Sequence, residues 1–500
     1  MKTVIIGAGF SGLSAACYMA RAGHEVVLLE KNAAPGGRAR QLVRDGFRFD
    51  MGPTFYWMPD LIEAFFADFG KTPKDYYELL RLDPSYEIVF GPDDRLALPA
   101  GPRAVGELFE RIEPGSGRFL SDFLRSARYN YRVAVDKVIH KPGDSALELL
   151  MPETLARVPQ FLLSLRHTVR RGVKDERLRR ILEFPALFLG ARPDNTPSFY
   201  RFMNHADMGL GTWHIAGGMV RLVEALKQLA ESLGARILTE QPAREIVVAA
   251  DRAVGVRTPQ AFFEADTVIS SADYRHTERL LPSACRNYSE MYWQHRVFAP
   301  SALIYYIGFG RRLERVSHHT LFFDTSFEEH AAKIYDSPGW PDKPLFYASF
   351  PSQSDPTLCP AGCEMAIILI PTAAGLPDTP AVRERYYHQV MDRMEALTRQ
   401  KLRGHVLFRE SYAASDFVRD YHAAKGNAYG LANILTQTAF MRPKIRNRKL
   451  PNLFYTGQLT VPGAGVPTAL VSGKLAAGCA LSRIAIPCPH ETYDYGSTLR

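Results

Sequence analysis

The chain opens with apolar runs separated by short turns, in the order strand, helix, strand. Lys2–Ile6 is a short β-branched run, typical of a buried parallel strand. Small residues dominate Ser11–Ala22, which predicts a helix that ends at Gly23. A second apolar run, His24–Leu29, predicts another strand, with Glu30 at its end. This pattern predicts a βαβ unit at the very start of the chain.

Further elements follow from the same kind of pattern. Residues from about 76 to 185 are expected to be mainly helical with interspersed strands. Met219–Leu233 has the leucine spacing of an amphipathic helix. We expect the β-type stretches between 235 and 270 to return to the sheet of the first unit. The other expected strands are Ala235–Thr239, Glu245–Thr258, Phe262–Ser270, Ala302–Phe309, Met365–Ile370 and Asn452–Thr456. The other expected helices are Ala381–Gln400 and Pro467–Ile484.

A length of 500 residues suggests two or three domains. The strand–helix units at both ends predict an α/β nucleotide-binding domain that is discontinuous in sequence, made of residues 1–75, 217–285 and 445–500. A second domain, made of residues 76–216 and 286–444, would then be inserted into it twice.

The turn after the first strand carries a dinucleotide fingerprint, Gly7-Ala8-Gly9-Phe10-Ser11-Gly12. Gly7 would permit the tight turn, Gly9 would let the backbone approach a pyrophosphate, and Gly12 would let the helix pack on the strand. The pyrophosphate would meet the positive end of the helix. Glu30, at the end of the next strand, is placed to accept hydrogen bonds from ribose hydroxyls.

A glycine pair and an arginine, Gly36-Gly37-Arg38, follow soon after Glu30. Glycines let a chain run beside an extended dinucleotide, and Arg38 is suited to neutralise its phosphates. The alternative is an ordinary surface turn with a solvated arginine, which we consider the weaker interpretation beside this fingerprint.

These motifs resemble the flavoprotein amine oxidase and carotenoid desaturase superfamily. Asp50–Asp60 (DMGPTFYWMPD) resembles the segment beside the flavin in bacterial-type phytoene desaturases, and Asn452–Gly457 with Pro462–Pro467 resembles their C-terminal signature. Further matches, in order along the chain, are Gly211–Trp213, Gly217–Met219, Ser271–Asp273, Gly426–Gly430 and Gln437–Pro443. One departure is Gln458, where many related flavoproteins carry an acid.

The resemblance implies FAD as the cofactor and a Rossmann-like, glutathione-reductase-like FAD domain with an inserted α+β substrate domain that associates with membranes. It implies hydride transfer from a C40 polyene to flavin N5, from phytoene towards lycopene, with reoxidation by a quinone or oxygen. The residues expected at FAD are Gly7, Gly9, Gly12, Glu30, Gly37, Arg38, Gly52, Pro53, Gly457, Gly465, Val466 and Pro467.

No metal signature, catalytic triad or P-loop is present in the sequence, so the chemistry is assigned to the flavin and the catalytic side chains are left unknown. Phe55, Tyr56 and Trp57 are candidates to line a substrate channel, although core packing explains each of them equally well. The pair His318–His319 is expected on a polar turn.

A net charge of +8 on 500 residues is too small to indicate nucleic-acid binding. Most of it, a net +6, lies between Arg157 and Arg180, interleaved with apolar residues. Such a segment suits an anionic membrane surface. A solvated helix with one face on its own domain is the more common explanation. The residues proposed for membrane contact are Arg170, Arg171, Arg179 and Arg180.

The C40 substrate implied by the resemblance favours membrane contact. At roughly 0.8 kcal/mol per buried CH₂, releasing such a hydrocarbon from lipid into water would cost about 30 kcal/mol, so the enzyme would have to take it directly from a membrane. No apolar run is long enough to span a bilayer, the glycines after Ile6 argue against a signal peptide, and six cysteines fit a reducing cytoplasm. The expected place is the cytoplasmic side of a membrane surface, with the oligomeric state open.

Three other interpretations stay open. One is a related carotenoid enzyme: a hydroxycarotenoid 3,4-desaturase, a C30 diapophytoene desaturase, or a polyene isomerase or saturase. The second is a flavin amine oxidase, which would need a closed aromatic cage with a polar rim. The third is an FAD-stabilised membrane scaffold without turnover.

Overall fold

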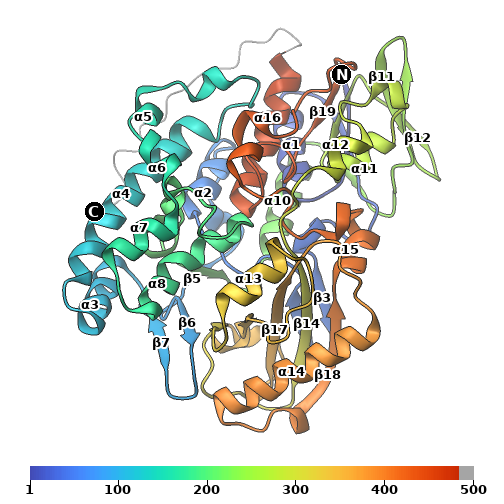
Figure 1. Ribbon diagram of the computed structural model, residues 1–500. Helices are drawn as coiled ribbons and strands as arrows, with labels where there is room; N and C mark the ends of the chain where they lie inside the picture. Colours follow the sequence, from blue (N-terminus) through green and yellow to red (C-terminus); the bar gives the residue numbers. More distant parts are fainter. Residues whose placement is uncertain (483–500) are drawn as a thin grey trace.

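The computed structural model describes residues 1–482 and contains two large β-sheets and a helical region (Figure 1). The predicted end of the last helix at Ile484, and the final part of the predicted FAD domain, lie outside the described residues. Among residues 1–482, no helix is both long and apolar enough to cross a membrane.

The first sheet is parallel and has five strands in the order β19-β13-β1-β2-β9. Its members come from the beginning, the middle and the end of the chain, as the predicted discontinuous domain requires, although the domain boundaries stay a prediction. The βαβ unit expected at the start is confirmed as β1, α1 and β2. The strands are β1 (Lys2–Ile6), β2 (Glu25–Leu29), β9 (Arg236–Leu238), β13 (Thr267–Ser270) and β19 (Leu453–Tyr455).

Two helices lie close together against this sheet, α1 (Phe10–Arg21) and α16 (Val466–Leu481) (Figure 1). The small residues of α1 are buried, and Gly473 of α16 faces it so closely that a Cβ there would overlap the carbonyl oxygen of Ser11. A third helix, α10 (Val220–Ser232), packs on another side of α1. The N-termini of α1 and α16 thus come together at one edge of the sheet.

The expectation that all stretches between 235 and 270 return to the first sheet is wrong in part. Only β9 and β13 join it, whereas β10, β11 and β12 form a separate antiparallel sheet. The reason is the tight turn at Ala250 and Asp251, both at positive φ, which connects β10 and β11 as a hairpin. The strands are β10 (Glu245–Ala249), β11 (Arg252–Arg257) and β12 (Phe262–Glu264).

The second large sheet has seven strands in the order β18-β14-β17-β16-β15-β6-β7. The interior strand β14, second in this order, is buried along its whole length, which explains its largely apolar sequence. The strands are β6 (Tyr86–Val89), β7 (Arg95–Leu98), β14 (Ser301–Phe309), β15 (His319–Phe322), β16 (Phe346–Ser349), β17 (Glu364–Thr372) and β18 (Val406–Tyr412). Two-stranded sheets are formed by β3 (Gln41–Arg44) with β4 (Phe47–Asp50) and by β5 (Leu79–Arg81) with β8 (Trp213–Ile215).

Helices between residues 102 and 204 gather on one side of the molecule (Figure 1). The helix expected at Ala381–Gln400 is confirmed as α14. The remaining helices are α2 (Pro59–Ala67), α3 (Pro102–Ile112), α4 (Ser116–Arg132), α5 (Pro152–Leu155), α6 (Val158–Leu162), α7 (Leu165–Gly172), α8 (Glu176–Glu183), α9 (Phe202–Asn204), α11 (Tyr274–Arg279), α12 (Glu290–Gln294), α13 (Phe327–Tyr335), α14 (Pro380–Thr398) and α15 (Ala414–Tyr421).

Candidate active site

One large cavity, of about 910 Å³, connects the glycine turn after β1 to the helical region. We distinguish a nucleotide end, at the edge of the parallel sheet, from an apolar arm, which runs between the seven-stranded sheet and the helices. The nucleotide end is lined by residues within the segments 6–11, 29–39, 241–243, 271–276, 417–422 and 456–458. The apolar arm is lined by residues within the segments 134–161, 184–203, 321–347, 367–371 and 433–440.

The fingerprint glycines have the geometry that their predicted roles require. Gly7 has a φ of 94°, in the region that favours glycine, and it lines the cavity together with Gly9. A Cβ on Gly12 would overlap the carbonyl oxygen of Gly7, so this residue serves helix–strand packing instead of facing the cavity. A Cβ on Gly37 would lie 3.4 Å from the Cα of Gly9, so the two glycine segments lie side by side.

Glu30 directly follows β2 at the cavity wall and is only 4% exposed. Its Oε2 accepts a hydrogen bond from the backbone N–H of Ala8 (2.9 Å), and its Oε1 accepts from the backbone and side-chain amides of Asn32 (both 2.9 Å). These bonds fix the carboxylate against the glycine turn. A carboxylate offers about four lone-pair sites, so capacity for a ribose hydroxyl is left.

Arg38 is half-buried in the wall of the nucleotide end. Its guanidinium donates to the carbonyl of Asn427 (3.3 Å) and lies over the ring of Tyr421, 5.1 Å from its centroid. Its Nε has no partner in the structure, and burial lowers the pKa of the group. A half-buried cation with a buried, unmet Nε donor, beside a cradle of glycines, fits the pyrophosphate of a dinucleotide.

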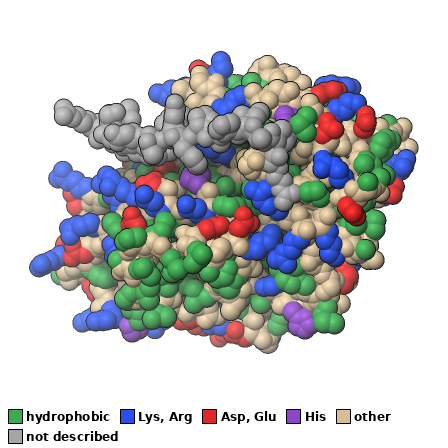
Figure 2. Space-filling model, turned by 90° about the horizontal axis from the view of Figure 1, so that it is seen from above, with side chains coloured by type: hydrophobic (Ala, Val, Ile, Leu, Met, Phe, Trp, Pro, Cys, Tyr) green, Lys and Arg blue, Asp and Glu red, His purple; other side chains and the backbone are tan. Residues whose placement is uncertain are grey.

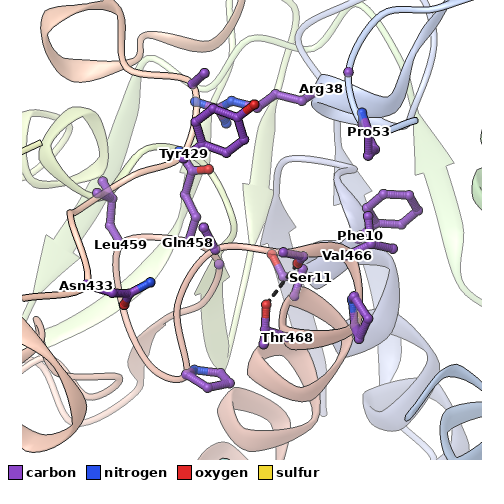
Figure 3. A pocket seen from close by; sticks show the side chains of 18 of the residues that line it. Phe10, Ser11, Arg38, Pro53, Tyr429, Asn433, Gln458, Leu459, Val466 and Thr468 are labelled. Atoms are coloured by element: carbon purple, nitrogen blue, oxygen red, sulfur yellow. Dashed lines mark hydrogen bonds between the residues drawn. The ribbon is translucent and has the colours of Figure 1, made fainter. Parts of the chain in front are cut away.

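The C-terminal loop enters the cavity between β19 and α16. Gly457 (φ 104°) and Gly465 (φ 132°) both need the glycine region of backbone space, and Pro467 occupies the first turn of α16. Figure 3 shows Val466 and Thr468 at this helix start beside Ser11, with Gln458 and Tyr429 across from Pro53. The positive end of α16 is therefore directed at the cavity.

Gly52 and Pro53 follow the hairpin β3–β4. A Cβ on Gly52 would overlap the carbonyl oxygen of Arg38, so Gly52 is required for the approach of these two segments. Both residues line the cavity between its nucleotide end and its apolar arm. Gln458, which replaces the acid of related proteins, donates to Asn427 Oδ1 (3.3 Å).

The aromatic candidates divide between the cavity and the core. Phe55 and Trp57 line the apolar arm. Tyr56 points away from it: its ring is 2% exposed and its hydroxyl bonds to that of Tyr77 at 3.0 Å. The prediction is therefore wrong for Tyr56, because consecutive side chains in an extended segment face opposite sides.

The histidine pair is also misplaced by the sequence prediction. His318 and His319 do not lie on a polar turn; both are buried, at the start of β15. The ring of His319 stacks on Phe55 with 3.9 Å between centroids. No spacing pattern marked these residues, because their role depends on contacts between distant segments.

The basic segment contains two kinds of arginine. Arg170 and Arg171 are exposed at the end of α7, as membrane contact would require. Arg180 is 11% exposed and forms ion pairs with Glu176, Glu183 and Glu328. Arg179 pairs with Glu176 and donates to the carbonyl of Val173. Because Arg179 and Arg180 are satisfied internally, the prediction that they face a membrane is wrong.

Comparison with known proteins identifies the family. The family model described as "flavin containing amine oxidoreductase" matches residues 10–481. The chain belongs to this family. It is accordingly an FAD-dependent oxidoreductase, and the glycine cradle, Glu30, Arg38 and the start of α16, which line one end of the cavity, are the groups that would hold the cofactor.

Relatives along the whole chain are carotenoid desaturases. The chain is 37% identical over 485 residues to the carotenoid 3,4-desaturase of Haloarcula japonica, covering 96% of this chain and 98% of that protein. It is 32% identical over 486 residues to the zeta-carotene-forming phytoene desaturase of Myxococcus xanthus, covering 95% and 92%. A 4,4'-diapophytoene desaturase of Staphylococcus haemolyticus is 31% identical over 498 residues, covering 97% and 99%.

Solved structures support the fold. An oxidoreductase from Methanosarcina mazei aligns with a TM-score of 0.63 at 19% identity, over 95% of this chain and 99% of that one. A fatty acid isomerase from P. acnes aligns with a TM-score of 0.58 at 14% identity, over 97% and 98%.

Proposed function

We propose that this protein is a carotenoid desaturase that works at a membrane surface and removes hydrogen from a long polyene held in the apolar arm. The observation that carries the proposal is the continuity of the cavity, from the dinucleotide cradle, past Phe55 and Trp57, to an apolar surface. FAD supplies the acceptor for the hydride. The protein binds the chain, excludes water and brings the reacting carbons to the flavin side of the cavity.

The outer end of the apolar arm supports entry from lipid. Leu150, Leu155 and Val158 line the cavity and are also exposed, so the cavity opens between them. Leu162 is 79% exposed and Leu147 is 72% exposed. We call the exposed apolar residues around this opening the mouth surface: Leu147, Leu150, Leu155, Val158, Leu162 and Leu163.

An exposed apolar surface of this kind is unusual on a soluble protein and typical of an interaction site. Cations stand near it in sequence, with Lys141 on the cavity wall and Arg170 and Arg171 on the adjoining helix α7. Figure 2 looks down on the end of the molecule that carries α5 and shows a hydrophobic patch beside a row of Lys and Arg side chains. Apolar residues flanked by cations suit an anionic leaflet.

The reaction step proposed first is desaturation of phytoene towards lycopene, with reduced flavin reoxidised by a quinone or oxygen on the cytoplasmic side. A second candidate is a later 3,4-desaturation. It is favoured by the 37% identity to the carotenoid 3,4-desaturase of Haloarcula japonica, which exceeds the 32% identity to the phytoene desaturase of Myxococcus xanthus.

Pigment analysis separates these candidates. The gene is expressed in one bacterial host that accumulates phytoene and in another that accumulates lycopene with hydroxylated end groups. New absorption bands of longer conjugation in the first host support phytoene desaturation, whereas a change only in the second supports 3,4-desaturation. Unchanged pigments in both hosts, with FAD bound to the purified protein, would contradict the proposal.

A variant with a blocked channel provides the matched control. Ala134 is buried in the wall of the apolar arm, away from the nucleotide end. Ala134→Trp should fill the arm, abolish pigment conversion and leave the FAD content unchanged.

A further inference from the structure

A hydroxyl group in the apolar arm is hydrogen-bonded to an imidazole. Tyr347, on β16, lines the cavity, and its hydroxyl lies 2.7 Å from Nδ1 of His319. The same hydroxyl lies 2.8 Å from Oγ1 of Thr54, the residue that follows Pro53 at the flavin side of the cavity. The stacking of Phe55 on the imidazole fixes the plane of the His319 ring.

Desaturation needs such a group. Making a C=C bond removes a hydride from one carbon and a proton from its neighbour, so a proton acceptor must stand beside the substrate. General bases must lie within hydrogen-bond reach of the proton they remove.

The carboxylates of the described cavity wall, and the imidazole of His330, are poorly placed for this role. Its carboxylates are Glu30, Asp273 and Asp420 at the nucleotide end and Glu148 at the mouth, where both oxygens of Glu148 accept backbone N–H groups. In the apolar arm, the imidazole of His330 is fully used, since its Nε2 bonds to the carbonyl of Pro371 and its Nδ1 accepts from the N–H of Leu345.

His319 differs from His330 in that its Nδ1 faces a side-chain hydroxyl of the cavity wall and not a backbone group. Its Nε2 has no hydrogen-bond partner in the structure. Burial lowers the pKa of His319 well below the usual value, so the imidazole is neutral before the reaction, and its Nδ1 can accept from the Tyr347 hydroxyl when the ring hydrogen is on Nε2. The same burial disfavours the imidazolium, so a proton received at Nδ1 is readily released again.

A buried carboxylate stands at the far end of the same cluster. The ring of His318 lies 4.4 Å from that of His319 and 4.7 Å from that of His214, and Nε2 of His214 lies 3.3 Å from Oδ2 of Asp355. Asp355 also accepts the N–H of Gly217 at 2.7 Å, and these hydrogen bonds lower its pKa. The carboxylate is therefore fixed beside His214, at the end of the cluster away from His319.

We propose that Tyr347 is a catalytic residue that removes the proton during desaturation and passes its own hydroxyl proton to Nδ1 of His319, which acts as the positioning and receiving residue. The inference rests on the proposed function. One C–H bond gives its electron pair and hydrogen to the flavin as hydride. The neighbouring C–H bond leaves its electron pair between the carbons as the new π bond, and its proton goes to the oxygen of Tyr347. The proton held on His319 is released when the acceptor, a quinone or oxygen, takes the electrons.

The test is anaerobic reduction of the bound flavin by carotenoid-loaded vesicles. The reduction is monitored in a stopped-flow instrument as the loss of flavin absorbance. Tyr347→Phe should slow the reduction by about 10²-fold, the lower range for loss of a general base. FAD content and quenching of flavin fluorescence by the bound polyene should be unchanged, since the ring remains. The control is Tyr305→Phe. Tyr305 lies on β14 of the same sheet, away from the cavity lining, and its hydroxyl donates to the backbone carbonyl of Arg383 on α14.

His319→Asn distinguishes proton transfer from hydrogen bonding. The Asn amide keeps a hydrogen-bonding group near the position of Nδ1 but does not take up a proton, so reduction should be slow although substrate binding persists. In the natural protein, reduction should be slower in D₂O than in H₂O, and this difference should vanish in Tyr347→Phe.

Each outcome bears on a different claim. Reduction of Tyr347→Phe at the natural rate, with FAD and polyene bound, would overturn the role of Tyr347, as would equal rates in H₂O and D₂O for the natural protein when deuterated substrate slows it. Failure of every carotenoid to reduce the natural protein would overturn the proposed function instead.

Discussion

Asp207 shows how a single buried carboxyl supports the wall of the cavity. Its Oδ2 accepts from the hydroxyl of Tyr86 (2.9 Å) and its Oδ1 accepts from Thr212 (3.2 Å). The Oγ1 of Thr212 in turn accepts the indole N–H of Trp57, which lines the apolar arm. Burial raises the pKa of Asp207 to about 7, so this residue couples the packing of Trp57 to pH.

The sign of this coupling predicts a pH dependence of stability. The folded-state pKa of about 7 lies above the ordinary value of 3.8, so the unfolded chain loses its proton first and stability falls as pH rises between these values. Asp207→Asn removes this titration but leaves one donor unmatched. The natural protein should therefore have the higher melting temperature at pH 5, and its advantage should shrink by pH 8.

Thermal unfolding of both proteins across this pH range is the measurement. Glu107→Gln, on the exposed face of α3, serves as the control, since its carboxylate is exposed and forms a surface ion pair with Arg103. An advantage that stays constant or grows between pH 5 and pH 8 would show that Asp207 is ionised in the folded state.

Residue roles could be predicted from sequence where one short segment carries the whole geometry. The turn from Gly7 to Gly12 and the acid at Glu30 are such cases, since the βαβ unit itself brings them together. Tyr347 and His319 were beyond prediction, because a tyrosine in one strand and a histidine in another acquire meaning only when β15 pairs with β16.

At the scale of elements, α7 presents its charge differently from α8. Both helices are strongly basic in sequence, yet α8 uses Arg179 and Arg180 in ion pairs, whereas α7 leaves Arg170 and Arg171 exposed. Hydropathy and charge counts cannot separate these cases, because the acidic partner Glu328 comes from α13, far along the chain.

We predict that Arg170→Glu combined with Arg171→Glu weakens binding to vesicles that contain phosphatidylglycerol. Near an anionic surface each cation contributes about 1 kcal/mol, and reversal replaces attraction by repulsion. Co-sedimentation with vesicles measures the effect, and the FAD content should be unchanged.

The matched control reverses Arg103 and Arg111 on α3, which changes the net charge equally at another part of the helical region. Equal loss of vesicle binding in both double variants would mean that overall charge, not α7, drives docking. Addition of Leu162→Gln, on the mouth surface, should weaken binding further even at high salt, because screening leaves apolar contacts intact.

Element positions followed closely from sequence patterns, but their partners did not. The strand expected at Ala302–Phe309 is β14, and the helix expected at Met219–Leu233 is α10. The assignment of residues 245–264 to the parallel sheet was wrong, because a run of β-type residues does not indicate which strand it will pair with. Here the tight turn between β10 and β11 pairs these two strands with each other as a hairpin.

At the scale of the whole molecule, the cavity joins segments from both ends of the chain. Gly7 and Gly457 stand in the same wall, and Phe346 of the seven-stranded sheet lines the other end. A ligand held between such segments stabilises the folded state by mass action.

Removal of FAD should therefore lower the unfolding temperature of the entire protein in one step. At a free FAD concentration of one hundred times its Kd, the expected stabilisation is about 2.7 kcal/mol. Differential scanning calorimetry of the protein with FAD and after its removal tests this. FMN, which lacks the adenosine that Glu30 is placed to bind, serves as the control ligand. Equal stabilisation by FAD and FMN would contradict the assignment of Glu30 to the adenosine ribose.

The mouth surface has a kinetic consequence. A channel that opens onto lipid samples only the molecules dissolved beside it, so the concentration that matters is a number per area of bilayer. At a fixed total amount of polyene, adding empty lipid dilutes the substrate in two dimensions and slows turnover, although nothing in the aqueous phase has changed. For the proposed entry from lipid, we therefore predict that rates follow the mole fraction of polyene in the membrane and not its molar concentration in the assay.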